Sequence, residues 1–233
     1  MKKDWLKIWC DQVWLYALYS IGVIMSCILI VEWGDLSIPK KMMCFLTILV
    51  PIHVFEENTF PGGFFYMNNI GQKSKNPLVY PQNMLTNMYT NFGAEIIFIL
   101  LFIFADKIPI TAAVVAAIFG YAECIHHTRD GINMYLKYKK KGKKTIYGPG
   151  SLSSFVGLIQ LSTYALIWLI DQKITMWAVG AGLGIVFFII VGMILIPFQI
   201  SKKVKSQRFA FQNCGYFEKY ERTACVTSEK NPY

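Results

Sequence analysis

The sequence predicts an all-α integral membrane protein, a bundle of about six transmembrane helices with both termini in the cytoplasm. Only 16% of the 233 residues are charged, whereas a soluble domain carries about 25%. The mean hydropathy is +0.40. The apolar residues also fall in unbroken blocks close to the roughly 20 residues that cross a hydrocarbon core. Together these observations exclude an ordinary soluble domain.

Six blocks account for residues 1–200 as one transmembrane domain. The predicted helices cover residues 13–33, 42–58, 84–105, 109–129, 151–170 and 174–200. Residues 201–233 are polar, without a clear period, and are predicted to form a basic cytoplasmic tail.

Local signals justify the helices in order. Trp5 and Trp9 precede the first block, where indole rings suit the headgroup level. The second follows Pro39 and contains Pro51, which removes one backbone hydrogen bond and is expected to kink the helix. The third follows a polar loop. The fourth begins at Pro109, a residue favoured in a first helical turn. The fifth follows a Pro-Gly turn, and the sixth ends where the basic tail begins.

The net charge of +9 is distributed unevenly along this topology. With the N-terminus inside, 19 of the 23 lysines and arginines lie in cytoplasmic segments. Only Lys40, Lys41, Lys107 and Lys173 remain outside. The positive-inside rule explains this bias in a cell-membrane protein and supports the cytoplasmic placement of both termini. We therefore expect contact with membrane lipid and no nucleic-acid partner.

The three histidines of the chain fall in two carboxylate-rich clusters. His53-Val54-Phe55-Glu56-Glu57 lies at the inner end of the second predicted helix. Glu123-Cys124-Ile125-His126-His127 lies near the inner end of the fourth. Positions three and four residues apart share a helix face. Each cluster can therefore present imidazole and carboxylate groups in one direction, from the same leaflet.

The third predicted helix carries a polar ladder in steps of four: Asn83, Asn87, Asn91 and Glu95. Glu95 lies inside an apolar run, where an ionisable group costs about 2.5–3.5 kcal/mol even on the gentler insertion scales. Asn87 and Asn91 are candidate pocket-lining residues, with helix packing as the alternative reading. Glu95 is harder to explain without a function.

Imidazole and carboxylate together form a ligand set for a divalent metal. Zinc is preferred, with iron or manganese as alternatives. The candidate ligands are His53, Glu57, Glu123, His126 and His127, and the candidate acid–base groups are Glu56 and Glu95. The spacing does not decide between His126 and His127. Two interpretations without a functional site stay open. In one, the groups near the helix ends face water; in the other, His53 is a hydrogen-bonded structural residue.

The motifs also resemble a known family. His53-Val54-Phe55-Glu56-Glu57, then His126-His127, then Tyr147-Gly148-Pro149-Gly150 occur in that order. The chain thereby resembles, over about residues 45–150, the bacterial integral membrane proteins named for an HXXEE motif, a family without an assigned activity. The resemblance implies that Tyr147 is a site residue. A rigid Pro-Gly turn is the alternative interpretation of the last motif.

Three functions follow from these features. The first is a membrane-embedded, metal-dependent enzyme, preferably a hydrolase, that acts on a lipid or other amphipathic substrate from the cytoplasmic leaflet. The second is a proton- or cation-coupled transporter or an immunity-type membrane subunit, because buried acids can carry protons or cations. The third is a non-catalytic membrane partner whose basic loop binds anionic lipid or protein.

Overall fold

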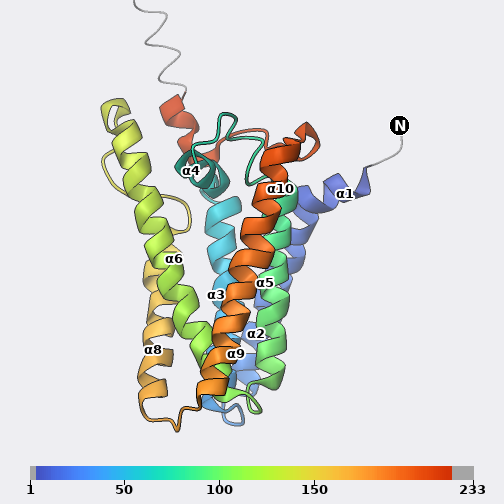
Figure 1. Cartoon of the computed structure of the whole chain (residues 1–233), viewed down its shortest axis with the longest axis vertical. Coiled ribbons are helices and arrows are strands. Elements are labelled where there is room, and N and C mark those ends of the chain that lie inside the picture. Colours follow the sequence, from blue (N-terminus) through green and yellow to red (C-terminus); the bar gives the residue numbers. More distant parts are fainter. Residues whose placement is uncertain (1–3, 222–233) are drawn as a thin grey trace, which may run out of the picture.

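The computed structural model describes residues 4–221 and confirms the all-helical membrane architecture (Figure 1). In this part of the chain six helices are long and apolar enough to cross a membrane, and no strand is present. The spans are Trp5–Val31, Ile38–Asn58, Met84–Phe104, Pro109–Lys141, Ser151–Ile170 and Met176–Val204. Residues 222–233 of the predicted tail lie outside the described residues.

Several spans are built from consecutive helical elements. The first contains α1 (Trp5–Ile8), the π-helical turn η1 (Trp9–Val13) and α2 (Trp14–Val31). The next three are α3 (Ile38–Asn58), α5 (Met84–Phe104) and α6 (Pro109–Tyr138), the last extended by the 3₁₀ turn η2 (Lys139–Lys141). The fifth contains α7 (Ser151–Ser153), the π-helical turn η3 (Ser154–Leu158) and α8 (Ile159–Ile170). The sixth contains α9 (Met176–Phe187), π-helical η4 (Phe188–Leu195) and α10 (Ile196–Val204).

Several helix boundaries differ from the sequence prediction. The first span is Trp5–Val31 instead of 13–33, and the sixth is Met176–Val204 instead of 174–200. The start of α3 and the end of α6 differ as well. Helix α3 begins at Ile38 instead of residue 42, because the Ser37 side chain accepts a hydrogen bond from the Lys40 amide and Pro39 occupies the first turn. Helix α6 continues nine residues beyond Arg129, because its polar end still buries Gly131, Met134 and Tyr138. Hydropathy alone ends that helix too early.

Helices α3 and α6 form the centre of the bundle. Just over half of the most apolar 18 residues in each of these two spans is buried, against 17% in the sixth span. Helix α3 packs against α2 and α5, while α6 packs against α8 and α9. Small residues make the α6 contacts close: a Cβ added at Gly120 would lie 2.3 Å from the Leu158 carbonyl oxygen. The two central helices also contact each other.

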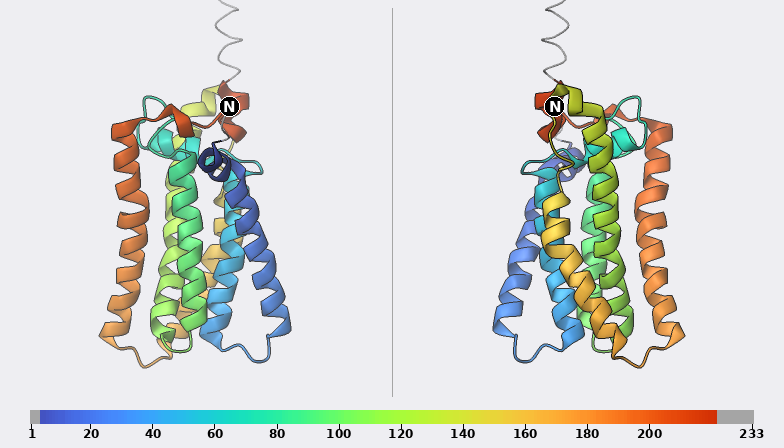
Figure 2. Two further views of the ribbon diagram at one scale, coloured as in Figure 1. Left: turned by 90° about the vertical axis from the view of Figure 1, so that its right-hand side faces the viewer. Right: turned by 90° about the vertical axis from the view of Figure 1, so that its left-hand side faces the viewer.

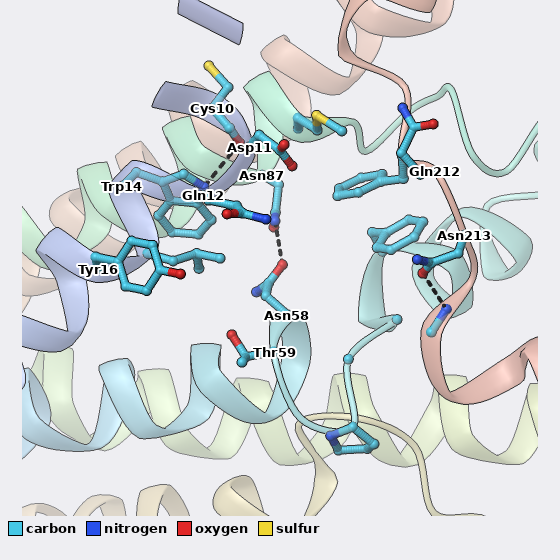
Figure 3. Close-up of a pocket in the computed structure, with 18 of the residues that line it drawn as sticks. Cys10, Asp11, Gln12, Trp14, Tyr16, Asn58, Thr59, Asn87, Gln212 and Asn213 are labelled. Carbon is cyan, nitrogen blue, oxygen red and sulfur yellow. Dashed lines mark hydrogen bonds between the residues drawn. The ribbon is translucent and has the colours of Figure 1, made fainter. Parts of the chain in front are cut away.

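Both described ends of the chain lie at the same end of the bundle (Figures 1 and 2). There the short helix α4 (Phe64–Gly71), which the sequence reading did not predict, packs with the segment 209–221. We call these two segments the cap. Its buried core and the adjoining end of α6 comprise Phe64, Phe65, Tyr66, Met67, Met134, Tyr138, Phe217 and Tyr220. A cavity remains beside the cap, between η1 and residues 211–215 (Figure 3).

Glycines allow the two cap segments to cross. Gly63 has a φ of +98°, and a Cβ there would lie 2.5 Å from the Cys214 carbonyl oxygen. The Tyr216 amide donates to the Gly62 carbonyl at 3.1 Å. Lys143 donates from Nζ to the Tyr147 carbonyl at 2.5 Å and lies 5.0 Å from the centroid of the Tyr216 ring. The Tyr147 ring also contacts the Tyr216 ring, with centroids 5.4 Å apart. The cap therefore contacts the loop that carries the Tyr147 motif.

Candidate metal centre

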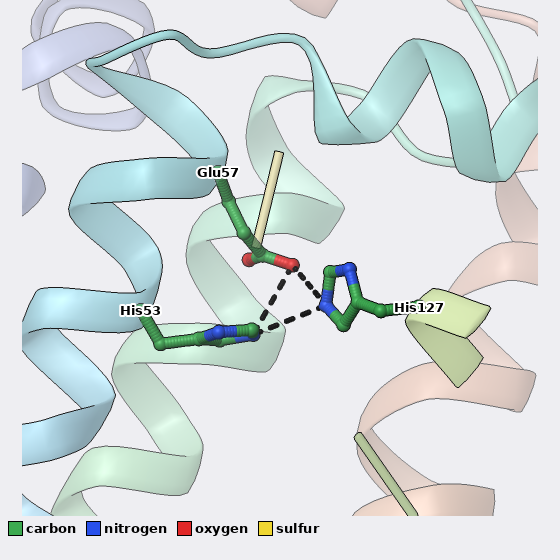
Figure 4. Close-up of side chains that lie close together, drawn as sticks. All are labelled: His53, Glu57 and His127. Atoms are coloured by element: carbon green, nitrogen blue, oxygen red, sulfur yellow. Dashed lines mark hydrogen bonds and ion pairs between the residues drawn. The ribbon is translucent and has the colours of Figure 1, made fainter. Parts of the chain in front are cut away.

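Three buried side chains from α3 and α6 converge under the cap (Figure 4). His53 Nε2 lies 3.4 Å from Glu57 Oε1 and 3.3 Å from His127 Nε2. His127 Nε2 lies 3.3 Å from the same Glu57 oxygen. The three residues are only 3%, 2% and 0% exposed, respectively. This group of two imidazoles and one carboxylate could hold a metal ion.

Helical spacing of four residues positions these groups. His53 and Glu57 occupy one face of α3, while Glu123 and His127 occupy one face of α6. Glu123 Oε2 lies 3.7 Å from His53 Nε2 and 3.6 Å from His127 Nε2. Its side chain is 22% exposed, so it is the most accessible member of this set of four. The two clusters predicted from the sequence thus face one point.

The spacing within the group fits a small tetrahedral ion. Ligand nitrogens and oxygens at about 2.0–2.1 Å from a tetrahedral zinc lie about 3.3–3.4 Å from one another. The separations of the three buried ligand atoms fall in that range. Glu123 Oε2 lies slightly farther out, on the side of the more accessible fourth position.

Ser153 fixes the tautomer of His53. Its Oγ donates to Glu56 Oε2 at 2.6 Å and lies 2.9 Å from His53 Nδ1. Because the hydroxyl proton is used on the carboxylate, Oγ must accept from Nδ1–H of His53. When His53 is neutral, its Nε2 therefore presents a lone pair toward Glu57 and His127. A cation held between these three atoms would take the place of the protons that otherwise lie between them.

Glu56 belongs to this support and lies outside the ligand group. Besides Ser153 Oγ, its carboxylate accepts hydrogen bonds from the amides of Leu152 and Ser153 at 3.1 and 2.8 Å and from the Tyr147 hydroxyl at 3.0 Å. The amides are unpaired first-turn donors of the fifth span, so a carboxylate there is favourable. Burial and the nearby Glu56 charge raise the pKa of Tyr147, which keeps its hydroxyl a donor.

His127 is held by packing. Gly150 has a φ of +91°, and a Cβ there would lie 2.1 Å from Cε1 of His127. The Phe64 ring of the cap lies on the imidazole with a centroid distance of 4.8 Å. Nδ1 of His127 has no hydrogen-bond partner among residues 4–221. The imidazole orientation is therefore set by these contacts and by the group at Nε2.

The remaining predicted site residues lie apart from the three-residue group. His126 turns to Asp130, with Nε2 3.2 Å from Oδ2. Glu95 is fully buried on α5, and neither carboxylate oxygen has a partner in the described part of the chain. Asn91 donates to Asn87 Oδ1 at 3.0 Å, and Asn87 donates to Asn58 Oδ1 at 2.5 Å. These amides form a hydrogen-bonded network, and Asn87 also lines the cavity of Figure 3.

Sequence reasoning missed Ser153, Phe64 and the role of Gly150. Ser153 lies 100 residues after His53, so only the fold shows their contact. The available signal was the Pro149-Gly150-Ser151 turn directly before the fifth span. Such a turn places serine side chains and free amides at a helix start, where they can meet a carboxylate.

A side pocket of about 370 Å³ reaches His127 from the flank of the bundle. Its lining is His127, Thr128, Thr145, Ile146, Tyr147, Ser151, Leu152 and Phe155. Leu152 and Phe155 are exposed on a membrane-spanning helix, so this flank faces the bilayer. The pocket thus joins an apolar surface to the imidazole at its inner end.

Comparison of the chain with protein-family models, with curated proteins and with solved structures finds no match in any of the three. The functional argument therefore rests on the geometry of the site.

Proposed function

We propose that the chain binds one divalent metal ion, zinc, through His53, Glu57 and His127, with the fourth position left to water beside Glu123. The observation that carries this proposal is the convergence of three buried potential ligand atoms at 3.3–3.4 Å, with the Nδ1–H of His53 directed to Ser153. A site with two histidines and one carboxylate also suits iron, and carboxylates suit manganese. Elemental analysis distinguishes the three metals.

Metal content tests the proposal, and the chain offers a matched control. Purified full-length protein should contain about one metal ion per chain. His53→Ala and His127→Ala should each lose it, whereas His126→Ala should retain it because His126 pairs with Asp130. Stoichiometric metal in His53→Ala, or an absence of metal in the wild type, would overturn the assignment.

Hydrolysis of a lipid or similar amphipathic molecule is the reaction that we propose for this centre. A divalent ion would supply a Lewis acid and an activated water. Glu123 Oε2, the most accessible carboxylate oxygen of the centre, would accept the proton from that water. The side pocket supports an acyl-bearing substrate, because it connects the bilayer flank to His127. Tyr147 also lines this side pocket. Its hydroxyl donates to Glu56, the carboxylate that accepts a hydrogen bond from Ser153 behind His53.

Activity should be tested in proteoliposomes. Release of fatty acid or head group from bilayer lipids, followed by mass spectrometry, should require the metal and the Glu123 carboxylate. We expect Glu123→Gln to reduce turnover by about 10²–10⁴-fold, the usual contribution of a general base. Equal turnover by wild type and His53→Ala would exclude catalysis at this centre.

Glu95 favours a second function, proton- or cation-coupled transport. A fully buried carboxyl without a partner among the described residues is expensive in a membrane helix and is often functional. Ion flux into liposomes that is abolished by Glu95→Gln but kept by His53→Ala would favour transport over hydrolysis.

We further propose that the chain belongs to the HXXEE-motif proteins and that the capped end faces the cytoplasm of a cell-membrane protein. The first proposal is supported by the meeting of His53, Glu56, Glu57, His127 and Tyr147 around one point. The second is supported by the lysine and arginine bias. Accessibility of a cysteine placed at Lys140 to an impermeant reagent in intact cells tests the orientation: labelling there would contradict it.

A further inference from the structure

A second site lies beside the cap and contains none of the proposed metal ligands. The cavity measures about 480 Å³, a volume typical of small-ligand pockets. It is bounded by η1 and α2, by the turn after α3, by the start of α5 and by residues 211–215. Segments from both halves of the chain thus build it, at the end of the bundle where the membrane interface would lie (Figure 3).

Carboxamides dominate the polar lining of this cavity. They belong to Gln12, Asn58, Asn87, Gln212 and Asn213. Each carboxamide both donates and accepts hydrogen bonds, as a hydroxyl group also does. A hydroxyl-rich ligand can therefore pair with each of them, whereas a carboxylate or phosphate could use only the donors.

The charges of the lining exclude an anionic ligand. Asp11 is its one carboxylate, and no lysine or arginine is among the lining residues. Phosphate recognition in proteins depends on such cations or on a helix N-terminus. An anionic head group would meet the Asp11 charge without compensation, whereas a hydroxyl pair can donate to it.

The cavity combines a fixed floor with free groups at its rim. Asn87 donates to Asn58 Oδ1 at 2.5 Å and accepts from Gln82 Nε2 at 2.8 Å, which holds both floor amides in place. The side chains of Gln12 and Asp11, by contrast, make no hydrogen bond or ion pair within residues 4–221. Gln12, Asn58 and Asn87 all line this cavity, so free and fixed amides face the same space (Figure 3).

Aromatic rings complete the wall. Trp14, Tyr16 and Phe65 line the cavity, and Tyr16 is exposed on the first membrane span. Flat rings offer apolar faces to the C–H surface of a polyol while their polar edges remain at the interface. The position of Tyr16 also leaves room for an acyl chain to continue along the outside of α2.

From these observations we propose that this cavity binds an uncharged, hydroxyl-rich group, a sugar or glycerol unit, either free or as the head group of a lipid. Gln12 and Asp11 bind its hydroxyls at the rim, and the Asn58–Asn87 pair forms the floor.

The test compares amphiphiles that share a dodecyl chain and differ in head group. Full-length protein in phosphatidylcholine nanodiscs is titrated with dodecyl glucoside, dodecyltrimethylammonium and dodecyl phosphate, and with free glucose. Affinity is taken from the shift in thermal unfolding. We expect the glucoside to bind, and Gln12→Leu to weaken binding by about tenfold, as when a ligand hydroxyl loses its partner. Gln199→Leu, at an exposed glutamine of α10, is the matched control and should bind normally.

Binding of free glucose as well would identify a soluble sugar, and binding of the glucoside alone would identify a lipid head group. Equal glucoside binding by wild type and Gln12→Leu overturns the proposal. So does a response to dodecyltrimethylammonium that Asp11→Asn removes, since the site would then bind amines. Metal content measured on the same samples keeps this outcome separate from that of the metal centre, because Gln12→Leu leaves the three proposed ligands and Glu123 in place.

Discussion

The metal centre and the carboxamide cavity lie at the same end of the bundle but differ in how their polar groups are satisfied. In the centre, His53 and Glu56 are committed to one another through Ser153, and the ligand group is buried. In the cavity, Gln12 and Asp11 remain free at an exposed rim. This contrast supports the two proposals, a small ion for the buried centre and a larger ligand, in exchange with water, for the cavity.

The largest effect should come from Gly150→Ala, which should displace the His127 ring from its position in the centre. The added Cβ would lie 2.1 Å from the His127 ring in a left-handed backbone conformation. We expect loss of the metal and destabilisation of about 1–3 kcal/mol or more from overpacking, measured by elemental analysis and thermal unfolding.

Gly142→Ala is the control for this prediction. Gly142 has a similar φ of +90°, but an added Cβ would meet nothing within 4 Å. It should show only the backbone cost of about 1 kcal/mol and keep its metal. Equal metal loss in both variants would mean that the contact with His127 is unimportant.

A smaller effect is expected for Ser153→Ala, which removes the partner of His53 Nδ1 and leaves every proposed ligand in place. Loss of a hydrogen-bond partner behind a ligating histidine typically costs about 10–100-fold in metal affinity. Competition with a chelator measures this change. Ser26→Ala is the matched control, because Ser26 bonds only to the Gly22 carbonyl within α2. An unchanged metal affinity in Ser153→Ala would show that the Ser153–Glu56 hydrogen bond does not support the centre.

The smallest effect concerns the ion pair near the cavity. The Arg208 guanidinium donates to both carboxylate oxygens of Asp4, at 2.8 and 2.7 Å, and lowers the pKa of Asp4 to about 2. Because the folded pKa lies below the unfolded value of 3.8, the stabilisation is present above about pH 4 and is lost as pH falls toward 2.

The hydrogen-exchange protection of residues 206–209, taken relative to the intrinsic rate at each pH, should therefore fall over this acidic range in the wild type. Asp4→Asn should exchange faster at neutral pH and lose the dependence. The change in hydrogen exchange should be small, since exposed ion pairs contribute little to stability. A pH dependence that survives in Asp4→Asn would assign it to another group.

The six spans could be predicted because membrane insertion depends on local apolar length, which the sequence displays directly. The pairing of His53 with Glu57 could also be anticipated, since a spacing of four residues fixes a helix face. The choice between His126 and His127 depends on the rotation of α6 against α3, which no local pattern specifies. The contacts of His127 Nε2 with Glu57 and His53, together with the packing of its ring against Gly150, show that His127 faces the ligand group.

The cap and the cavity could not be predicted from the sequence, because their contacts join segments that are far apart in the chain. Helix α4 begins with the run Phe64-Phe65-Tyr66-Met67, which has no period that separates a buried face from an exposed one. Its environment is supplied by residues 209–221, far along the chain. Asn87 was expected to line a pocket, but its partner Asn58 and the Gln12 rim come from two other helices.

The order of the cap segments along the chain has a consequence for biosynthesis. Every proposed metal ligand, and Ser153 behind them, precedes residues 209–221 in the sequence. At about 5–20 residues per second, a ribosome would make this segment several seconds after Ser153. The nascent protein thus passes through a stage in which the residues of the candidate centre and helix α4 exist while the second half of the cap is still missing.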